Sequence, residues 1–375
     1  MTSLTHAGAS HGKRSGIRVP ELDGLRGIAI LLVLCFHFTP TTGPLRFLAP
    51  VLQVGWVGVD LFFVLSGFLI TGILLDSKGQ PGWYRNFIAR RSLRIFPLYY
   101  ACLALYAVLS YYPSSVRWGH FLNSGDGWWY ITYLGNFRVF LQNAWPALYI
   151  LTPLWSLQVE EQFYLTFPFI VSSLSRGRLR TVLAGSVIAA LALRIVLTLV
   201  MPENKVSTYV LMPCRMDALA MGGLIAIAQR ETPGWFQSRW IPWITGVSAA
   251  LFVTVCVCFT VAPWSAAMRT LGFTAAGLAF AGLLVMLISY RHPVLSRFFR
   301  IRLLCWIGTI SYGLYLLHIP ASIIASRVVG SRLGLAPHGS AEFFLSIAAA
   351  ILAAWISWTV FESPILKLKN RITVR

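Results

Sequence analysis

The sequence predicts an all-α protein that crosses a membrane many times, and three observations predict it. Of the 375 residues, 57% are hydrophobic and only 11% are charged, whereas about a quarter of the residues of a soluble protein are charged. Apolar runs of about 20 residues, the length that a spanning helix needs, recur along the chain. Residues 241–267 contain no Lys, Arg, Asp or Glu. We therefore expect a bundle of about ten transmembrane helices and no separate soluble domain.

We interpret ten segments as the expected spans, although the apolar part of the first of them is short. The segment 127–143 is predicted instead to be interfacial or re-entrant, because Trp and Tyr favour the headgroup level. The predicted spans are residues 24–42, 52–75, 96–113, 151–173, 181–201, 211–229, 241–261, 270–290, 303–325 and 342–361.

The Lys and Arg residues in alternate connections predict the orientation, because cytoplasmic loops retain basic residues. Of the 31 Lys and Arg, 21 fall on one side and 6 on the other. The richer side includes both ends of the chain. We expect a cytoplasmic tail over 1–20, a membrane domain over 21–364 and a basic cytoplasmic tail over 365–375. The net charge of +19 thus reflects topology, and no basic stripe for nucleic acid is indicated.

The sequence gives no support to several kinds of chemistry. All six cysteines lie in apolar segments without metal-ligand spacing, which is typical of small buried side chains. No Gly-rich phosphate loop or Gly-x-Ser-x-Gly nucleophile elbow is present, since the string GASHG at residues 8–12 lies in the polar N-terminal tail; ATP hydrolysis, hydride transfer and soluble-type esterase chemistry are therefore not indicated. We expect no metal and no permanently bound cofactor.

Four acidic residues, Asp60, Glu160, Glu161 and Asp217, fall inside predicted spans. An ionisable residue costs about 2.5–3.5 kcal/mol at the centre of a bilayer on insertion scales. These side chains must therefore face a polar interior or a water-filled cavity.

The segment "ELDGLRGIAILLVLCFHF", residues 21–38, carries Arg26 and His37 on nearly one face of the first span. Eleven steps of about 100° separate them, which returns to the same face about 16 Å further along the axis. Such a pair suits a long substrate with an anionic end for the guanidinium and a reactive end. There a neutral imidazole can take a proton from an attacking hydroxyl. A core histidine hydrogen-bonded for packing is the other interpretation.

Three arginines, Arg90, Arg91 and Arg94, precede the third span. Arg91 and Arg94 are three residues apart and share a helical face. A positive-inside anchor explains them by itself. If the substrate is anionic and cytosolic, they are its landing site.

Asp60 lies in a Gly-rich span, "VGWVGVDLFFVLSGFLIT", and two roles are open for it. It could orient His37 and stabilise its imidazolium, as carboxylates do for catalytic histidines in other folds, or it could make an interhelical hydrogen bond. The glycines let a neighbouring helix or a ligand approach closely. For Arg215 and Asp217 in a later span we favour structural charge pairing.

The segment "LWSLQVEEQFYLTFP" carries Ser156 and Glu160 at i and i+4 on a shared face. The adjacent Glu160 and Glu161 point to different faces, so they do not form a general acid/base pair on their own. One is expected to bind a sugar hydroxyl while the other pairs with an arginine, such as Arg194 or Arg215.

The segment "TISYGLYLLHIP" places Ser311, Tyr315 and His318 at i, i+4 and i+7, a polar stripe on an apolar helix. A second buried histidine favours a polar cavity. His318 is equally compatible with a satisfied interfacial position near the outer membrane face.

With these residues in view, the chain resembles the acyltransferase-3 family of bacterial polytopic membrane acyltransferases over nearly its full length. Seven segments match in order: "ELDGLRGIAILLVLCFHF", "GVDLFFVLSGFLIT", "RRSLRIFPLYY", "LWSLQVEEQFYL", "RMDALAMGGLIA", "ISYGLYLLHIP" and "FESPI". The resemblance implies a ten-helix bundle in the bacterial cytoplasmic membrane. Such a bundle takes an acyl group, usually acetyl, from cytosolic acyl-coenzyme A (acyl-CoA) and places it on a hydroxyl of a glycan or other acceptor.

The resemblance also assigns residues. The family's arginine-to-histidine motif falls on Arg26 and His37, and its short arginine motif falls on Arg91 and Arg94. Its second-helix aspartate falls on Asp60. The resemblance thus makes His37 the expected base, with Asp60 as a further catalytic residue, and the three arginines the expected sites for the acyl-CoA phosphates.

The family's tryptophan-serine-glutamate motif falls on Trp155, Ser156 and Glu160. Glu160 is expected to take part in catalysis, and Trp155 and Ser156, with Tyr315 and His318, are expected to contact the acceptor. Direct transfer and a covalent acyl intermediate both stay open. So does the choice between completing the transfer alone and passing the acyl group to a separate extracytoplasmic transferase.

Acceptors compatible with the sequence are an exopolysaccharide, a lipopolysaccharide, a lipid-linked saccharide or a small secondary metabolite. Two other classes of function stay in view. A proton-coupled exporter would use the buried carboxylates and His37 as a relay. A structural membrane subunit would tolerate substitution of His37.

Overall fold

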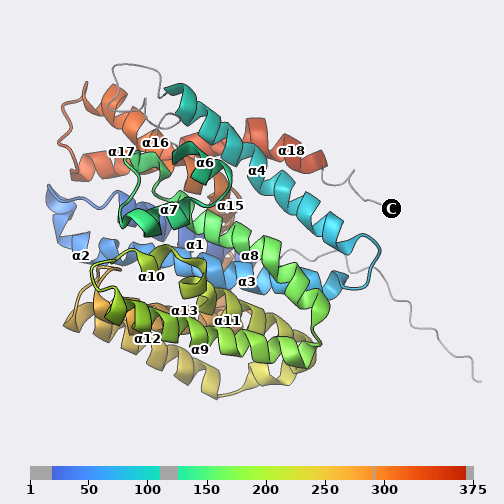
Figure 1. Ribbon diagram of the computed structural model, residues 1–375. Helices are drawn as coiled ribbons and strands as arrows, with labels where there is room; N and C mark the ends of the chain where they lie inside the picture. Colours follow the sequence, from blue (N-terminus) through green and yellow to red (C-terminus); the bar gives the residue numbers. More distant parts are fainter. Residues whose placement is uncertain (1–18, 110–125, 290–291, 369–375) are drawn as a thin grey trace, which may run out of the picture.

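The computed structural model describes residues 19–109, 126–289 and 292–368, and within these ranges the regular structure is helical, without a strand (Figure 1). The long helices are α1 (Pro20–His37), α3 (Gly58–Ser77), α4 (Trp83–Leu109), α8 (Leu154–Ser173), α9 (Arg176–Val200), α11 (Met212–Glu231), α12 (Trp240–Cys258), α13 (Phe273–Ile288), α16 (Ser311–Ala325) and α17 (Ser340–Ser357). Each overlaps a predicted span, but α4 begins at Trp83, well before the span predicted over 96–113, whose last residues lie outside the described ranges.

Short helical pieces connect or extend the long helices. The short α-helices are α2 (Ala49–Leu52), α6 (Asp126–Ile131), α7 (Gly135–Gln142), α10 (Ser207–Val210), α14 (Pro293–Phe299), α15 (Arg302–Thr309) and α18 (Ser363–Leu368). The 3-10 turns are Pro44–Leu48, Gln53–Val57, Tyr149–Leu151 and Pro233–Gln237. The π turns are Met268–Gly272, Ser326–Gly330 and Trp358–Glu362.

The prediction of an all-α, multi-pass membrane protein is confirmed. Within the described ranges, seven helical stretches are long and apolar enough to cross a membrane. Helices α1, α4 and α8 are outside these seven, and they carry Arg26, Arg91 and Glu160. A total of ten spans and cytoplasmic ends stay predictions. The predicted tails lie largely outside the described residues.

Helices α1 and α3 occupy the middle of the bundle in Figure 1, with α4, α16 and α17 on one side and α9, α11, α12 and α13 on the other. Helix α1 packs on α15 and α3, and α3 packs on α11 and α8. The two helices that carry Arg26, His37 and Asp60 are therefore surrounded by others rather than exposed at the periphery.

Two glycines bring α3 and α11 into backbone contact. A Cβ atom on Gly67 would lie 1.9 Å from the carbonyl oxygen of Leu219, and one on Gly222 would lie 2.0 Å from that of Val64. Neither position can hold a larger side chain without separating the helices. The close helix approach expected around Asp60 is confirmed, and it places the start of α3 beside the start of α11.

Two predicted segments are interrupted. The predicted span 303–325 consists of α15 and α16, which meet at Ile310 (φ −93°, ψ 7°). The segment 127–143 forms α6 and α7, and Tyr133 between them has φ 59°. The Tyr133 ring stacks on Tyr99 of α4 with centroids 4.3 Å apart, which fixes the turn against the bundle.

Candidate active site

A basic cavity lies between α1, α3 and α4, and we name it the arginine vestibule. Its volume is about 330 Å³, and Arg26, Arg90, Arg91 and Arg94 all line it. Helix α4 presents three of these guanidinium groups because residues 90, 91 and 94 lie within one and a half turns. The vestibule can bind a polyanion such as a group of phosphates.

Next to the vestibule lies a smaller central cavity of about 100 Å³. Helix α8 contributes Ser156 and Glu160 to it, one turn apart, as their spacing predicts. Tyr315 of α16 and Val59 of α3 also line it. The cavity is therefore lined by five helices, α1, α3, α4, α8 and α16, with a carboxylate in its wall.

A third cavity, of about 230 Å³, is lined in part by His37, and we name it the aromatic cavity. Val59 of α3 and Tyr315 of α16 line it as well. The other aromatic residues in its wall are Phe36, Trp56, Trp145, Tyr149, Trp155, Tyr209 and Trp264. Rings of this kind offer stacking surfaces to an acceptor, and His37 is the titratable nitrogen base among the lining residues.

The three cavities adjoin one another. The vestibule and the central cavity share Leu69 and three arginines, Arg26, Arg91 and Arg94. The central and aromatic cavities share Val59 and Tyr315. Arg26 and His37, at opposite ends of α1, thus lie at opposite ends of one row of cavities.

Two of the guanidinium groups in the vestibule are oriented by neighbouring side chains. Arg26 Nη1 donates to Asp23 Oδ1 at 3.1 Å, and its side chain stays 23% exposed. The Arg91 guanidinium lies over the ring of Tyr164 at 5.4 Å and that of Phe87 at 5.9 Å. These contacts orient Arg26 and Arg91 while leaving donors available for a ligand.

Glu160 accepts two hydrogen bonds within the central cavity. Ser66 Oγ donates to Glu160 Oε1 at 2.9 Å, and the Tyr164 hydroxyl donates to Glu160 Oε2 at 2.8 Å. Ser66 and Tyr164 were not predicted as site residues, and Tyr164 is recognisable only as the i+4 neighbour of Glu160. These two hydrogen bonds orient the carboxylate in the wall of the central cavity.

The tautomer of His37 follows from its hydrogen bond. Its Nδ1 lies 3.0 Å from the carbonyl oxygen of Val33, and because a carbonyl only accepts, Nδ1 carries the hydrogen of the neutral ring. Nε2 then holds the lone pair, as a general base requires. The ring of His318 lies next to it, with centroids 4.8 Å apart.

His318 is fully buried, and its Nδ1 lies 2.8 Å from the Tyr315 carbonyl oxygen. Its Nε2 has no hydrogen-bond partner among the described residues. His318 does not line any of the three cavities but sits against His37. The structure therefore places His318 behind His37, and His318 would affect an acceptor in the aromatic cavity only indirectly, through the His37 ring.

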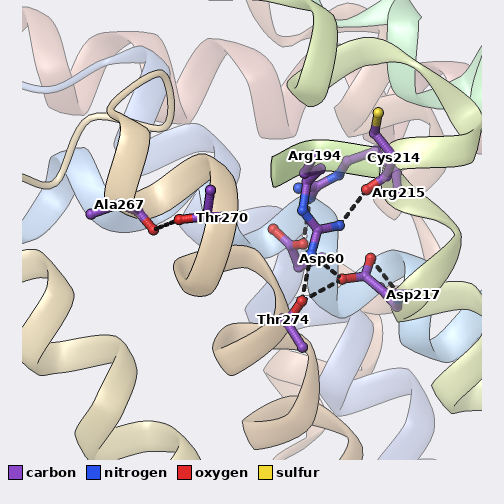
Figure 2. Close-up of polar contacts among 9 residues, drawn as sticks. Asp60, Arg194, Cys214, Arg215, Asp217, Ala267, Thr270 and Thr274 are labelled. Atoms are coloured by element: carbon purple, nitrogen blue, oxygen red, sulfur yellow. Dashed lines mark hydrogen bonds and ion pairs between the residues drawn. The ribbon is translucent and has the colours of Figure 1, made fainter. Parts of the chain in front are cut away.

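The expectation that Asp60 orients His37 is wrong. Asp60 is 1% exposed and pairs with Arg215 of α11, while the Nδ1 of His37 faces the Val33 carbonyl. Figure 2 shows Asp60 beside Arg194 of α9, Arg215 of α11 and Thr274 of α13. The interhelical alternative describes this contact.

A second buried ion pair lies beside the first (Figure 2). Arg194 Nη2 of α9 lies 2.8 Å from Asp217 Oδ2, which also accepts from Thr274 Oγ1 at 3.0 Å. The structural charge pairing expected for Arg215 and Asp217 is confirmed, each with a partner from another helix. The expectation that an α8 glutamate pairs with Arg194 or Arg215 is wrong, because aspartates occupy both.

Ser156 and Tyr315 form a short polar contact between α8 and α16. Their hydroxyl oxygens are 2.5 Å apart, and the Tyr315 hydroxyl donates to the carbonyl oxygen of Pro153 at 2.9 Å. Trp155 faces the other way, toward the aromatic cavity, where its ring lies 4.5 Å from that of Tyr209. Adjacent residues of one motif thus serve two cavities.

Sequence reasoning missed most of the aromatic cavity. Trp145 and Tyr149 come from the connection before α8, and Trp264 comes from the one after α12. The signal for them is weak, because tryptophan in such connections is also typical of membrane-interface belts.

These features define a helical membrane protein with a row of cavities that is lined by arginines at one end and by a histidine at the other. The acyltransferase domain family matches residues 19–360. The chain belongs to this family of membrane acyltransferases, and the resemblance drawn from its motifs is confirmed.

Curated relatives match most of the chain. The chain is 29% identical over 373 residues to the peptidoglycan O-acetyltransferase OatA of Listeria monocytogenes, covering 93% of this chain and 56% of the relative. It is 28% identical over 378 residues to the O-acetyltransferase OatA of Staphylococcus aureus, covering 93% and 57%. It is 29% identical over 377 residues to the putative peptidoglycan O-acetyltransferase YrhL of Bacillus subtilis, covering 92% and 55%.

The chain spans little more than half the length of these relatives. No solved structure matched it.

Proposed function

We propose that this protein transfers an acetyl group from cytosolic acetyl-CoA to a hydroxyl of a cell-envelope saccharide at the opposite end of the bundle. The observation that carries the proposal is the row of adjoining cavities with Arg26, Arg91 and Arg94 at one end and His37 at the other. The relatives named as peptidoglycan O-acetyltransferases support a saccharide acceptor.

The donor end of the proposal rests on charge and shape. Acetyl-CoA carries its phosphates at one end and its thioester at the other, joined by a long flexible arm. Guanidinium forks suit the phosphates, and the vestibule offers four of them. With the phosphates bound there, the arm enters the central cavity past Glu160 and the acyl group leads toward His37.

The acceptor end rests on His37 and the aromatic rings around it. In direct transfer, His37 Nε2 takes the proton of the acceptor hydroxyl while the hydroxyl oxygen bonds to the thioester carbonyl carbon. The carbon–sulfur bond then breaks, and the CoA thiolate takes the proton from His37. The Nδ1 hydrogen bond to Val33 keeps the ring in the required tautomer throughout.

The ion pairs do not favour the proton-coupled exporter. Its relay would need the buried carboxylates to be free to exchange protons with His37. Asp60 and Asp217 are instead each paired with a buried arginine, Arg215 and Arg194 respectively.

The proposal is tested by label transfer in membranes that contain the protein. Radiolabelled acetyl-CoA is added, and label is counted in the extracted glycan and lipid fractions for wild type and His37→Ala at matched abundance. His292→Ala is the matched control, because His292 lies outside the three cavities, before α14. We expect incorporation for wild type and His292→Ala and its loss in His37→Ala.

Equal incorporation in all three proteins would make His37 structural and overturn the proposed base. Incorporation in none of them would exclude acetyl-CoA as donor or envelope saccharides as acceptor.

A further inference from the structure

The arginine vestibule has an uncharged end as well as its guanidinium groups. Trp83, Asn86 and Phe87, near the start of α4, line it together with the arginines. None of these three lines the central or the aromatic cavity, whereas Arg91 and Arg94 line the central cavity too. The aromatic and amide side chains therefore lie at the end of the vestibule that is farther from the central cavity.

Three hydroxyl or amide side chains line the vestibule, and two of them are already bonded within the protein. Ser77 Oγ donates to the Ile73 carbonyl oxygen at 2.8 Å, and Gln80 Nε2 donates to that of Asp76 at 3.3 Å. Asn86 Oδ1 is buried and has no hydrogen-bond partner among the described residues. Such an acceptor costs free energy until a donor reaches it. Because the last side-chain torsion of asparagine is soft, either amide atom can turn to the cavity.

The order of these groups along α4 matches the order of the groups along an acyl-CoA. At a rise of about 1.5 Å per residue, Asn86 lies about 7.5 Å and Trp83 about 12 Å from Arg91 along the helix axis. An acyl-CoA carries its adenine base first, then its phosphates, then the arm that ends in the thioester. With the phosphates on Arg91 and Arg94 and the arm directed to the central cavity, the base falls beside Trp83 and Asn86.

A tryptophan ring and an asparagine amide are suited to adenine. The indole offers a face on which a base can stack. The amide can donate to a ring nitrogen of adenine while it accepts from the exocyclic amine. Guanine cannot make this pair, because it has an oxygen in place of that amine. Among the described residues that line the vestibule none is acidic, so no carboxylate there repels the phosphates.

We propose that Trp83 and Asn86 form a subsite for the adenine base of acyl-CoA. The vestibule then selects a nucleotide thioester over the phosphopantetheine thioester of a carrier protein, which has a phosphate and an arm but no base. This inference rests on the proposed function, in which the CoA phosphates bind the arginines of the vestibule.

Competition between nucleotides tests the subsite. ADP and GDP carry the same phosphates and differ in the base, and each is used to displace labelled CoA from the purified protein in detergent. We expect wild type to bind ADP about tenfold more tightly than GDP, because a two-bond contact discriminates between bases by about this factor. Asn86→Ala should abolish the preference. Trp83→Ala should weaken both nucleotides about tenfold, since it removes the stacking surface.

The matched control is Gln80→Ala. Gln80 is an amide of the same cavity whose nitrogen is already bonded to the Asp76 carbonyl, so its loss should leave the preference for ADP unchanged. Arg91→Ala should weaken both nucleotides equally, because it removes a contact to the phosphates that the two have in common.

Equal affinities of wild type for ADP and GDP, or binding of neither, would overturn the inference. So would a preference that persists in Asn86→Ala, or one that falls equally in Gln80→Ala. Failure of the proposed function looks different, because wild type would then transfer no label from acetyl-CoA in membranes, whatever its affinity for nucleotides.

Discussion

Replacing Asp60 by Asn separates a structural role from a catalytic one. The substitution keeps the size of the side chain but removes the negative charge that faces Arg215. Both side chains are almost completely buried, at 1% and 0% exposure. The Arg215 guanidinium would keep its stacking on Phe273, 4.1 Å from the ring centroid, but would lose its ionic partner.

The expected cost follows from the burial. Breaking a buried ion pair by removing one partner costs about 3–5 kcal/mol, because the remaining charge is left uncompensated. That is about two to four orders of magnitude in the folded-to-unfolded ratio. Removing both charges, as in Asp60→Leu with Arg215→Met, is expected to restore most of the stability, since apolar replacements of buried pairs are often neutral.

Thermal unfolding in detergent, followed beside acetyl transfer per folded molecule, checks this expectation. Asp60→Asn should unfold at a clearly lower temperature, and the double variant should recover. A stable Asp60→Asn protein that has lost turnover would refute the reasoning and return Asp60 to the reaction.

Three other predictions follow from the vestibule and the cavities. Arg91→Ala and Arg94→Ala should each weaken CoA binding about 10–100-fold, since a hydrogen bond to a charged group contributes about 1.5–3 kcal/mol. Calorimetry in detergent measures the affinity, with Arg85→Ala as the control because Arg85 is exposed and lies outside the cavities. Unchanged affinity would remove the docking role of the arginines. Raising the ionic strength should weaken CoA binding in wild type, because salt screens exposed charges; affinity independent of salt would argue against an arginine-lined entrance. Trp264→Ala should raise the KM for the acceptor with little change in CoA affinity, because of the three cavities Trp264 lines only the aromatic one. A change confined to CoA affinity would contradict the assignment of the acceptor to that cavity.

Much of the fold was predictable because a membrane imposes it. Length and hydropathy place most of the long helices, since a span must satisfy its own backbone hydrogen bonds. They place α4 poorly, because this helix begins at Trp83 among basic residues, before the apolar run. The break at Ile310 between α15 and α16 was not predictable, because it interrupts an apolar run. It depends on packing against α1, where an added Cβ on Gly308 would lie 1.8 Å from the Asp23 carbonyl oxygen.

The residues of the candidate site likewise fall into a group that the sequence could relate and a group that it could not. Residues on one helix, such as Arg26 and His37 or Ser156 and Glu160, could be related by helical periodicity, and all four line the row of cavities. The partner of Asp60 could not, because Arg215 is 155 residues away and the pairing follows from the backbone contact of α3 with α11. Periodicity orders residues within a helix but does not say which helices meet.

The central claim is that donor and acceptor enter at opposite ends of the bundle. Proteoliposomes with acceptor sealed inside, and acetyl-CoA added only outside, test it most directly. An impermeant thiol reagent identifies the molecules whose vestibule faces outward, by the labelling that Arg85→Cys, at the exposed start of α4, adds to that of the native cysteines. We predict that acetylation of the enclosed acceptor rises in proportion to that fraction. Acetylation that requires donor and acceptor on the same side of the membrane would contradict the account.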